Sequence, residues 1–157
     1  MFVLLVTGCG GGGLSAQTLA GTGYTFSAPG SWSVARTHRQ LQASAGKESV
    51  ELVVVSRFRL LRAFRPELWP KVIGELDRTA KRIAEQQHGS VTETKTVIVS
   101  GRRARRYTVA YDLRGTRLAE RLAFVLRAKT EYLLLCRYEQ GKRSEACDML
   151  LRTFRLM

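Results

Sequence analysis

The chain is poor in acidic side chains and in histidine. It has 13 aspartates and glutamates against 26 lysines and arginines, and its only histidines are His38 and His88. The resulting net charge of +13 favours anionic partners such as membrane headgroups, anionic polymers or nucleic acid. Neither histidine accompanies a Gly-x-Ser-x-Gly motif or a set of metal ligands. We therefore expect no enzyme, no cofactor and no metal site.

The chain also lacks a long hydrophobic run. No stretch approaches the roughly 20 apolar residues that span a bilayer as a helix. Its 157 residues, 45% of them hydrophobic, suffice for one domain with its own core and are too few for two comfortable domains. The acids, including Asp77 and Glu120, are spaced like ordinary surface residues, so we expect them at the surface.

The N-terminus carries a short apolar segment that ends at a cysteine. Residues 2–6 are apolar, and Val6-Thr7-Gly8-Cys9 resembles the bacterial lipobox, in which an aliphatic and a small residue precede a lipid-modified cysteine. Small residues give a peptidase access to the bond before Cys9, whose thiol receives the diacylglycerol. We expect a signal peptide at residues 1–8, a lipidated Cys9 with a glycine-rich tether at residues 9–22, and a domain at residues 23–157.

One feature departs from this pattern, because no lysine or arginine precedes the apolar segment. Either the true start lies upstream of Met1, or residues 2–6 form a buried first strand followed by a glycine-rich loop at Gly10–Gly13. No Gly-Lys-Ser/Thr follows these glycines, so they do not form a P-loop. The lipoprotein interpretation predicts an extracytoplasmic protein, lipid-anchored to a bacterial membrane, and argues against nucleic acid as a partner.

Two kinds of periodicity divide the rest of the chain. Alternation and continuous apolar runs predict strands at residues 24–27, 32–34, 48–55, 96–100, 103–113, 118–127 and 132–138. Spacing of three and four predicts an amphipathic helix over residues 66–88, and Ser144 can cap a closing helix. This order predicts an α+β domain. Its antiparallel β-sheet is packed, on one face, by one long amphipathic helix and a short C-terminal helix.

These features together resemble the PsbP-like superfamily. The shared features are the opening aromatic and proline positions, the long helix, the three-strand meander after Gly101 and the closing segment Leu150–Arg155. The opening positions are Tyr24, Phe26, Pro29 and Trp32. The resemblance covers residues 23–157 and implies an α+β sandwich used as a binding or assembly module. It carries over no catalytic residue, since the family shares none.

Two cysteines remain once Cys9 is assigned to the lipid. An even number of remaining cysteines in an exported chain indicates a disulfide. A bridge between Cys136 and Cys147 would join the last meander strand to the closing helix. Such a bridge would contribute about 3 kcal/mol by the loop-closure model. The alternative is a pair of free buried thiols.

The arginines gather in three clusters, around Arg57, Arg103 and Arg117. The first interleaves arginines with large apolar residues over positions 57–65. It is either a strand end and loop packed under the helix, or a segment that lies on a membrane or partner. We expect at least two clusters to share a face, with Arg103 and Arg105 on opposite faces of their strand. The candidate residues for anionic-surface binding are Arg57, Arg59, Arg62, Arg65, Arg103, Arg105 and Arg117.

Together these observations predict a non-catalytic, membrane-anchored envelope lipoprotein that binds an envelope protein or an anionic polymer or lipid surface. The alternative is a carrier that holds a lipid or small apolar ligand between sheet and helix. A hydrolase is the third class. The packing of the interior distinguishes these classes of protein, because a filled core favours the interaction module and a large apolar pocket favours the carrier. A polar pocket with converging titratable groups would favour the enzyme.

Overall fold

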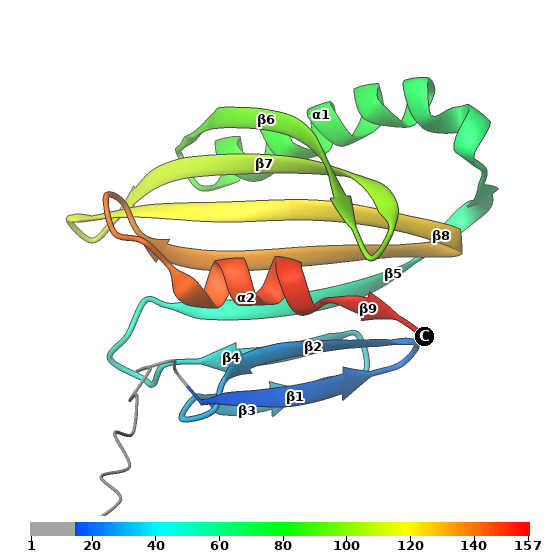
Figure 1. Cartoon of the computed structure of the whole chain (residues 1–157). Coiled ribbons are helices and arrows are strands. Elements are labelled where there is room, and N and C mark those ends of the chain that lie inside the picture. Colours follow the sequence, from blue (N-terminus) through cyan, green and yellow to red (C-terminus); the bar gives the residue numbers. More distant parts are fainter. Residues whose placement is uncertain (1–14) are drawn as a thin grey trace, which may run out of the picture.

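The computed structural model describes residues 15–157, and Figure 1 shows how its layers are arranged. A six-stranded antiparallel sheet of order β3-β4-β5-β8-β7-β6 forms the centre. A three-stranded sheet of order β1-β2-β9 lies on one face with the short helix α2, and the long helix α1 lies on the other. The α+β class with one long and one short helix is as predicted.

The strands and helices are joined by short connections. The strands are β1 Ala16–Gly21, β2 Tyr24–Pro29, β3 Ser33–Arg36, β4 Gln40–Ser44, β5 Leu52–Phe64, β6 Ser90–Val99, β7 Arg102–Leu113, β8 Thr116–Glu139 and β9 Arg155–Leu156. The helices are the 3₁₀ turn η1 Pro66–Leu68, α1 Trp69–Gln86 and α2 Glu145–Thr153.

Strand β8 folds back on itself and supplies two arms to the large sheet. Its first arm pairs with β7 and its second arm with β5. The Gln140 N–H donates to the Arg117 carbonyl at 2.9 Å, which brings the two ends of β8 together. The reversal lies at Ala128, whose φ is 50°, and Lys129. The two predicted strands at residues 118–127 and 132–138 are these two arms.

Helix α1 covers one face of the large sheet. Leu76, Ala80 and Ala84 form its buried stripe and pack on strand side chains that include Tyr107 and Leu122. The predicted spacing of three and four therefore identifies the packed side of this helix.

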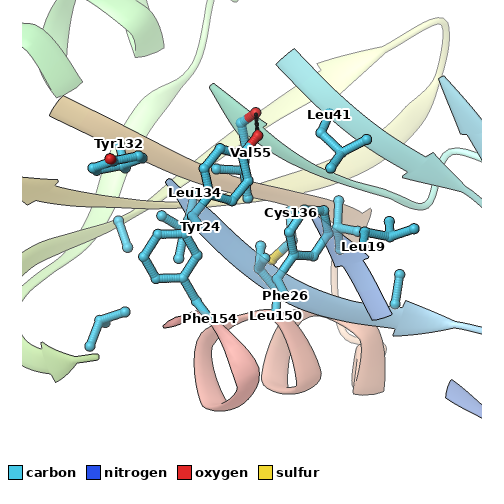
Figure 2. Close-up of a cluster of buried hydrophobic side chains, with 14 of the residues drawn as sticks. Leu19, Tyr24, Phe26, Leu41, Val55, Tyr132, Leu134, Cys136, Leu150 and Phe154 are labelled. Carbon is cyan, nitrogen blue, oxygen red and sulfur yellow. Dashed lines mark hydrogen bonds between the residues drawn. The ribbon is translucent and has the colours of Figure 1, made fainter. Parts of the chain in front are cut away.

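The small sheet and α2 cover the other face of the large sheet. Figure 2 shows Tyr24 and Phe26 of β2 gathered with Phe154 against Tyr132 and Leu134 of β8. The two helices thus lie on opposite faces, which corrects the expectation that both lie on one face. Strand alternation gives the reason, since the second arm of β8 turns apolar side chains to both faces and each face needs a cover.

The folded domain includes residues 16–21, so it does not start at residue 23 as expected. Residues 16–21 form β1, which pairs along its whole length with β2. Gly21 and Gly23, at the end of the expected tether, lie at the tight turn between these strands, where Gly23 has a φ of 82°. The predicted signal peptide and Cys9 lie outside the described residues.

Several strands differ from the prediction. Strand β5 continues through the arginine-rich segment to Phe64, and β6 begins at Ser90 rather than residue 96. Strand β4 was not predicted at all. Strand β6 is an edge strand with mostly exposed polar side chains, so its N-terminal half shows little apolar alternation.

Candidate anionic-surface site at one end of the sheet

One end of the large sheet collects basic side chains from several segments. The β3–β4 turn meets β5 there, because the Arg57 N–H donates to the Arg39 carbonyl at 2.9 Å. The β8 reversal, the β6–β7 turn and the C-terminal strand β9 adjoin it, beside the C-terminus in Figure 1. We call this surface the arginine end. Its basic residues are Arg36, Arg39, Arg57, Arg59, Arg62, Arg65, Arg102, Arg103, Arg127, Lys129 and Arg155.

Little acidic charge opposes the arginine end. Within residues 15–157, the ion pairs involve other cations, namely Arg78, Lys81, Lys95, Arg105, Arg106, Arg121, Lys142 and Arg143. Glu67 and Glu131 are the acids in the adjoining segments. Burial raises the pKa of the Glu131 carboxyl, which favours its neutral form. Clustered cations with so little opposing charge produce a positive field at this end.

A surface hollow of about 630 Å³ opens within the arginine end. We call it the β5 hollow, because β5 forms its middle, between the β3–β4 turn and the β8 reversal. Its lining residues are His38, Arg39, Arg57, Phe58, Arg59, Lys129 and Thr130. None of these lining residues is acidic, so the hollow presents cationic and hydroxyl donors together with one aromatic residue.

Strand β5 also bulges outward at the arginine end. Its register against β8 shifts between Arg59 and Phe64, so residues 60–63 leave the regular ladder. The Leu61 side chain at this bulge is 99% exposed. An exposed leucine between arginines has the composition of a segment that can lie in a lipid interface.

Two predicted binding arginines lie away from the arginine end. Arg105 pairs with Asp77 of α1 at 3.1 Å, and its side chain is only 18% exposed. Arg117 lies at the opposite end of the large sheet, where β8 begins. The other predicted residues, Arg57, Arg59, Arg62, Arg65 and Arg103, all lie at the arginine end.

Arg103 and Arg105 lie on the same face of β7, so the expectation of opposite faces is wrong. The Arg103 guanidinium carbon lies 5.8 Å from the ring centroid of Trp69, which belongs to α1. Residues two positions apart in a strand point to the same side, and α1 covers that side here.

His38, Arg39 and Lys129 were not predicted as binding residues. They occupy two turns that are remote in sequence from each other. Their basic character is the only local signal, and it does not indicate which other segment will adjoin them. The pairing of β4 with β5 and of β5 with β8 brings them together.

Two acids predicted at the surface take part in hydrogen bonds under α1. Glu120 is 4% exposed and accepts from the Tyr111 hydroxyl at 2.7 Å and from Gln87 Nε2 at 2.9 Å. Asp77 accepts from the Tyr107 hydroxyl at 2.6 Å. Burial and the adjacent carboxylate raise the pKa of each tyrosine well above its ordinary value, so both remain protonated donors. These groups hold the helix to the sheet.

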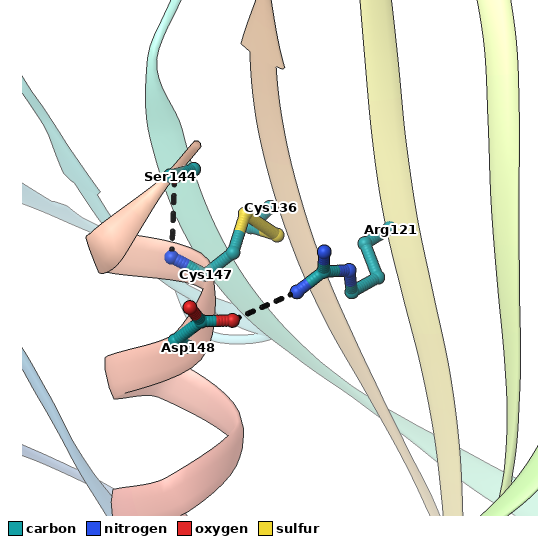
Figure 3. The surroundings of a disulfide bond; sticks show 5 residues. All are labelled: Arg121, Cys136, Ser144, Cys147 and Asp148. Carbon is teal, nitrogen blue, oxygen red and sulfur yellow. Dashed lines mark hydrogen bonds and ion pairs between the residues drawn. A yellow bond between two sulfur atoms is a disulfide. The ribbon is translucent and has the colours of Figure 1, made fainter. Parts of the chain in front are cut away.

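Cys136 and Cys147 form the disulfide expected from the sequence (Figure 3), with their Cα atoms 5.4 Å apart. The Ser144 hydroxyl accepts the Cys147 N–H at 3.3 Å and caps α2, as predicted. Arg121 of β8 donates to Asp148 at 3.1 Å. The disulfide and this ion pair fasten the start of α2 to β8.

Membrane-spanning helices and metal-binding clusters are both absent from the described residues. Within residues 15–157, no helix is both long enough and apolar enough to cross a membrane. In the same part of the chain, no three histidine, cysteine or acidic side chains gather as a potential metal site.

The architecture is a PsbP-like fold. No protein-family model and no curated protein matches the chain, but solved structures share its fold. A protein from Bacteroides thetaiotaomicron aligns with a TM-score of 0.59 at 9% identity over 86% of this chain, which spans only 45% of that protein. Cyanobacterial PsbP (CyanoP) from Synechocystis aligns with a TM-score of 0.69 at 12% identity, over 97% of this chain and 99% of CyanoP.

A further structure with this fold is LpqN of Mycobacterium tuberculosis, a protein involved in cell envelope biogenesis. It aligns with a TM-score of 0.53 at 8% identity, over 91% of both chains. At these identities the likeness defines the fold and does not by itself define an activity.

Proposed function

We propose that this protein is a non-catalytic binding module of the bacterial cell envelope whose arginine end attaches to an anionic surface. One observation carries the proposal: arginines from several strands and turns converge on one end of the sheet, while the ion pairs of residues 15–157 lie elsewhere. Clustered cations attract phosphate-bearing headgroups and anionic polymers, with screening over about 8 Å at physiological ionic strength.

Three observations support a location in the envelope. A buried disulfide persists in oxidising compartments outside the cytoplasm. The Val6–Cys9 motif supports a lipid anchor at Cys9. The shared fold of LpqN, which is involved in cell envelope biogenesis, agrees with this location.

The exposed Leu61 favours a lipid surface over a soluble polymer. Arginines can bind lipid phosphates while the leucine between them enters the headgroup region, and burial of its side chain there is worth about 1.5–3 kcal/mol. A soluble polyanion offers the leucine no comparable apolar environment.

The interior lends little support to the alternative, a carrier of a lipid or small apolar ligand. Side chains fill both layers between the large sheet and its covers. The hollow of about 620 Å³ beside α1 is lined in part by Asp77, Lys81 and Glu85, and apolar ligands prefer less charged walls.

Vesicle co-sedimentation tests the proposal. The full-length chain carrying Cys9→Ser, which cannot be lipidated, is mixed with phosphatidylcholine vesicles or with vesicles rich in phosphatidylglycerol. We expect tighter binding to the anionic vesicles, with an affinity that falls as salt rises. Arg59→Glu with Arg62→Glu should weaken binding more than Lys81→Glu with Arg82→Glu, which makes the same charge change on α1. Equal binding to neutral and anionic vesicles contradicts the proposal.

A further inference from the structure

We infer that the β5 hollow is a specific binding site for the phosphate group of a phosphate ester. This inference rests on the proposed function and adds to it the chemistry of one ligand group and the residues that hold it. The ester is carried either by a lipid headgroup or by a free molecule, and both present the same phosphate oxygens.

The donors around the hollow match a phosphate group. Arg39, Arg57 and Arg59 supply planar guanidinium groups that bind two oxygens at once, and the Lys129 ammonium adds a compact charge. Thr130 adds a hydroxyl. Donors on several sides suit a tetrahedral anion better than a flat carboxylate, which offers two oxygens in one plane.

The backbone beneath these donors is held by regular pairing. The Thr37 hydroxyl oxygen accepts the N–H groups of Arg39 and Gln40 at 3.3 and 3.1 Å, which fixes the β3–β4 turn. The Arg57 N–H donates to the Arg39 carbonyl at 2.9 Å and joins that turn to β5. Binding therefore requires the ordering of side chains and little movement of the main chain, which lowers its entropic cost.

The cations that line the hollow have no ion-pair partner within residues 15–157. No internal carboxylate has to be displaced before an anion binds. A smaller adjoining hollow shares His38, Arg39 and Arg57 and adds Arg36, which extends the positive field toward the small sheet.

The size of the hollow favours an ester over free phosphate. The hollow of about 630 Å³ is much larger than a phosphate group, so it also has room for the organic part of an ester. Phe58, which is 38% exposed, adds an apolar side chain to the lining, and strand alternation turns it to the face of β5 opposite to Arg57 and Arg59.

Titration with soluble esters tests the site, with backbone amide NMR shifts of the full-length Cys9→Ser chain as the readout. The probe is glycerol 3-phosphate, with inorganic phosphate and glycerol for comparison. The hollow pair, Arg39→Gln with Lys129→Gln, removes two lining cations. The control pair, Arg62→Gln with Arg65→Gln, removes two charges at the arginine end outside the hollow. All four side chains are exposed, so both variants should fold.

We expect shifts centred on residues 37–39, 57–59 and 129–130, and tighter binding of glycerol 3-phosphate than of inorganic phosphate. The hollow pair should weaken glycerol 3-phosphate binding at least about tenfold, since one charge-assisted hydrogen bond corresponds to about a tenfold change. The control pair should weaken it less than about twofold. Equal weakening by both pairs, or shifts spread evenly over the arginine end, would overturn the site.

A parallel experiment with vesicles distinguishes failure of this inference from failure of the proposed function. If the soluble ester distinguishes the two pairs but no variant changes binding to anionic vesicles, the site stands and the surface-binding function fails. If both pairs weaken vesicle binding alike and the ester does not distinguish them, the function stands and the site fails. A larger loss for the hollow pair than for the control pair on phosphatidylglycerol vesicles, but not on vesicles given equal charge by a fatty acid, supports the site and identifies the ester as a lipid headgroup. An equal loss for the two pairs on both kinds of vesicle, with the soluble ester still distinguishing the pairs, supports the site and identifies a free ester.

Discussion

Loss of the Cys136–Cys147 disulfide should lower the free energy of unfolding by about 3 kcal/mol. The two cysteines are separated by 11 positions, and closing a loop of this length in the unfolded chain is worth about 3 kcal/mol at 25 °C in the chain-entropy model. Both side chains are almost fully buried, so the bridge also lies within the packed layer between α2 and the large sheet.

Urea unfolding of the Cys9→Ser chain, followed by circular dichroism with and without reductant, measures this contribution directly. Cys136→Ala with Cys147→Ala should lose at least as much stability, because the alanines also leave small gaps in the core. The Ser144→Ala variant is the control, since it removes the α2 cap at a cost of about 1 kcal/mol but retains a response to reductant. A free energy of unfolding that reductant leaves unchanged would refute the reasoning.

Three further predictions concern the anchor, the bulge and a partly buried acid. When the protein is produced in a bacterial host with an upstream start that supplies a functional signal peptide, it should incorporate labelled palmitate. Cys9→Ser should abolish the label, and unchanged labelling of this variant would contradict a lipid anchor at Cys9. Leu61→Asp should weaken binding to anionic vesicles several-fold while changing the free energy of unfolding by less than about 0.5 kcal/mol, because the side chain is fully exposed; binding equal to that of the parent chain excludes Leu61 from the contact. Burial raises the pKa of Glu131 above its unfolded value, so this carboxyl destabilises the fold as pH rises past that value. Glu131→Gln should therefore increase the unfolding free energy at pH 7 and leave it nearly unchanged near pH 3, and a loss of stability at pH 7 would contradict the assignment.

Local patterns were sufficient to predict the elements whose signals are local. The stripe that includes Leu76 and Ala80 identified the buried side of α1. Turns of the meander were visible as Ser100–Gly101 and Arg114–Gly115, where both residues of each pair have left-handed φ values, as tight hairpin turns require. The two cysteines left after Cys9 indicated the disulfide that joins α2 to β8.

The remaining features depend on contacts between segments far apart in the sequence. Strand β4 has only two buried apolar side chains, Leu41 and Ala43, which is too short a pattern to predict a strand. Glu120 resembled a surface acid because its partners come from other segments: Tyr111 adjoins it through the pairing of β7 with β8, and Gln87 reaches it once α1 packs on the sheet.

The arginine clusters show the same limit. Their spacing predicted that charge gathers in the fold, but not that the Arg57 and Arg103 clusters share an end while Arg117 lies at the other. That outcome follows from strand direction, because β5 and β7 place these arginines beside the same reversal of β8. Arg39 enters the surface through the pairing of β4 with β5, and Lys129 belongs to the reversal itself.

Hydrogen–deuterium exchange on vesicles tests the central claim most directly, because it reports which end of the sheet meets the anionic surface. The full-length Cys9→Ser chain is compared free and bound to phosphatidylglycerol-rich vesicles. We predict added protection in peptides that cover residues 57–65 and 127–130, and none in those that cover residues 114–117 and 140–143 at the opposite end. Protection at the opposite end, or equal protection at both ends, would contradict the assignment of the arginine end as the binding surface.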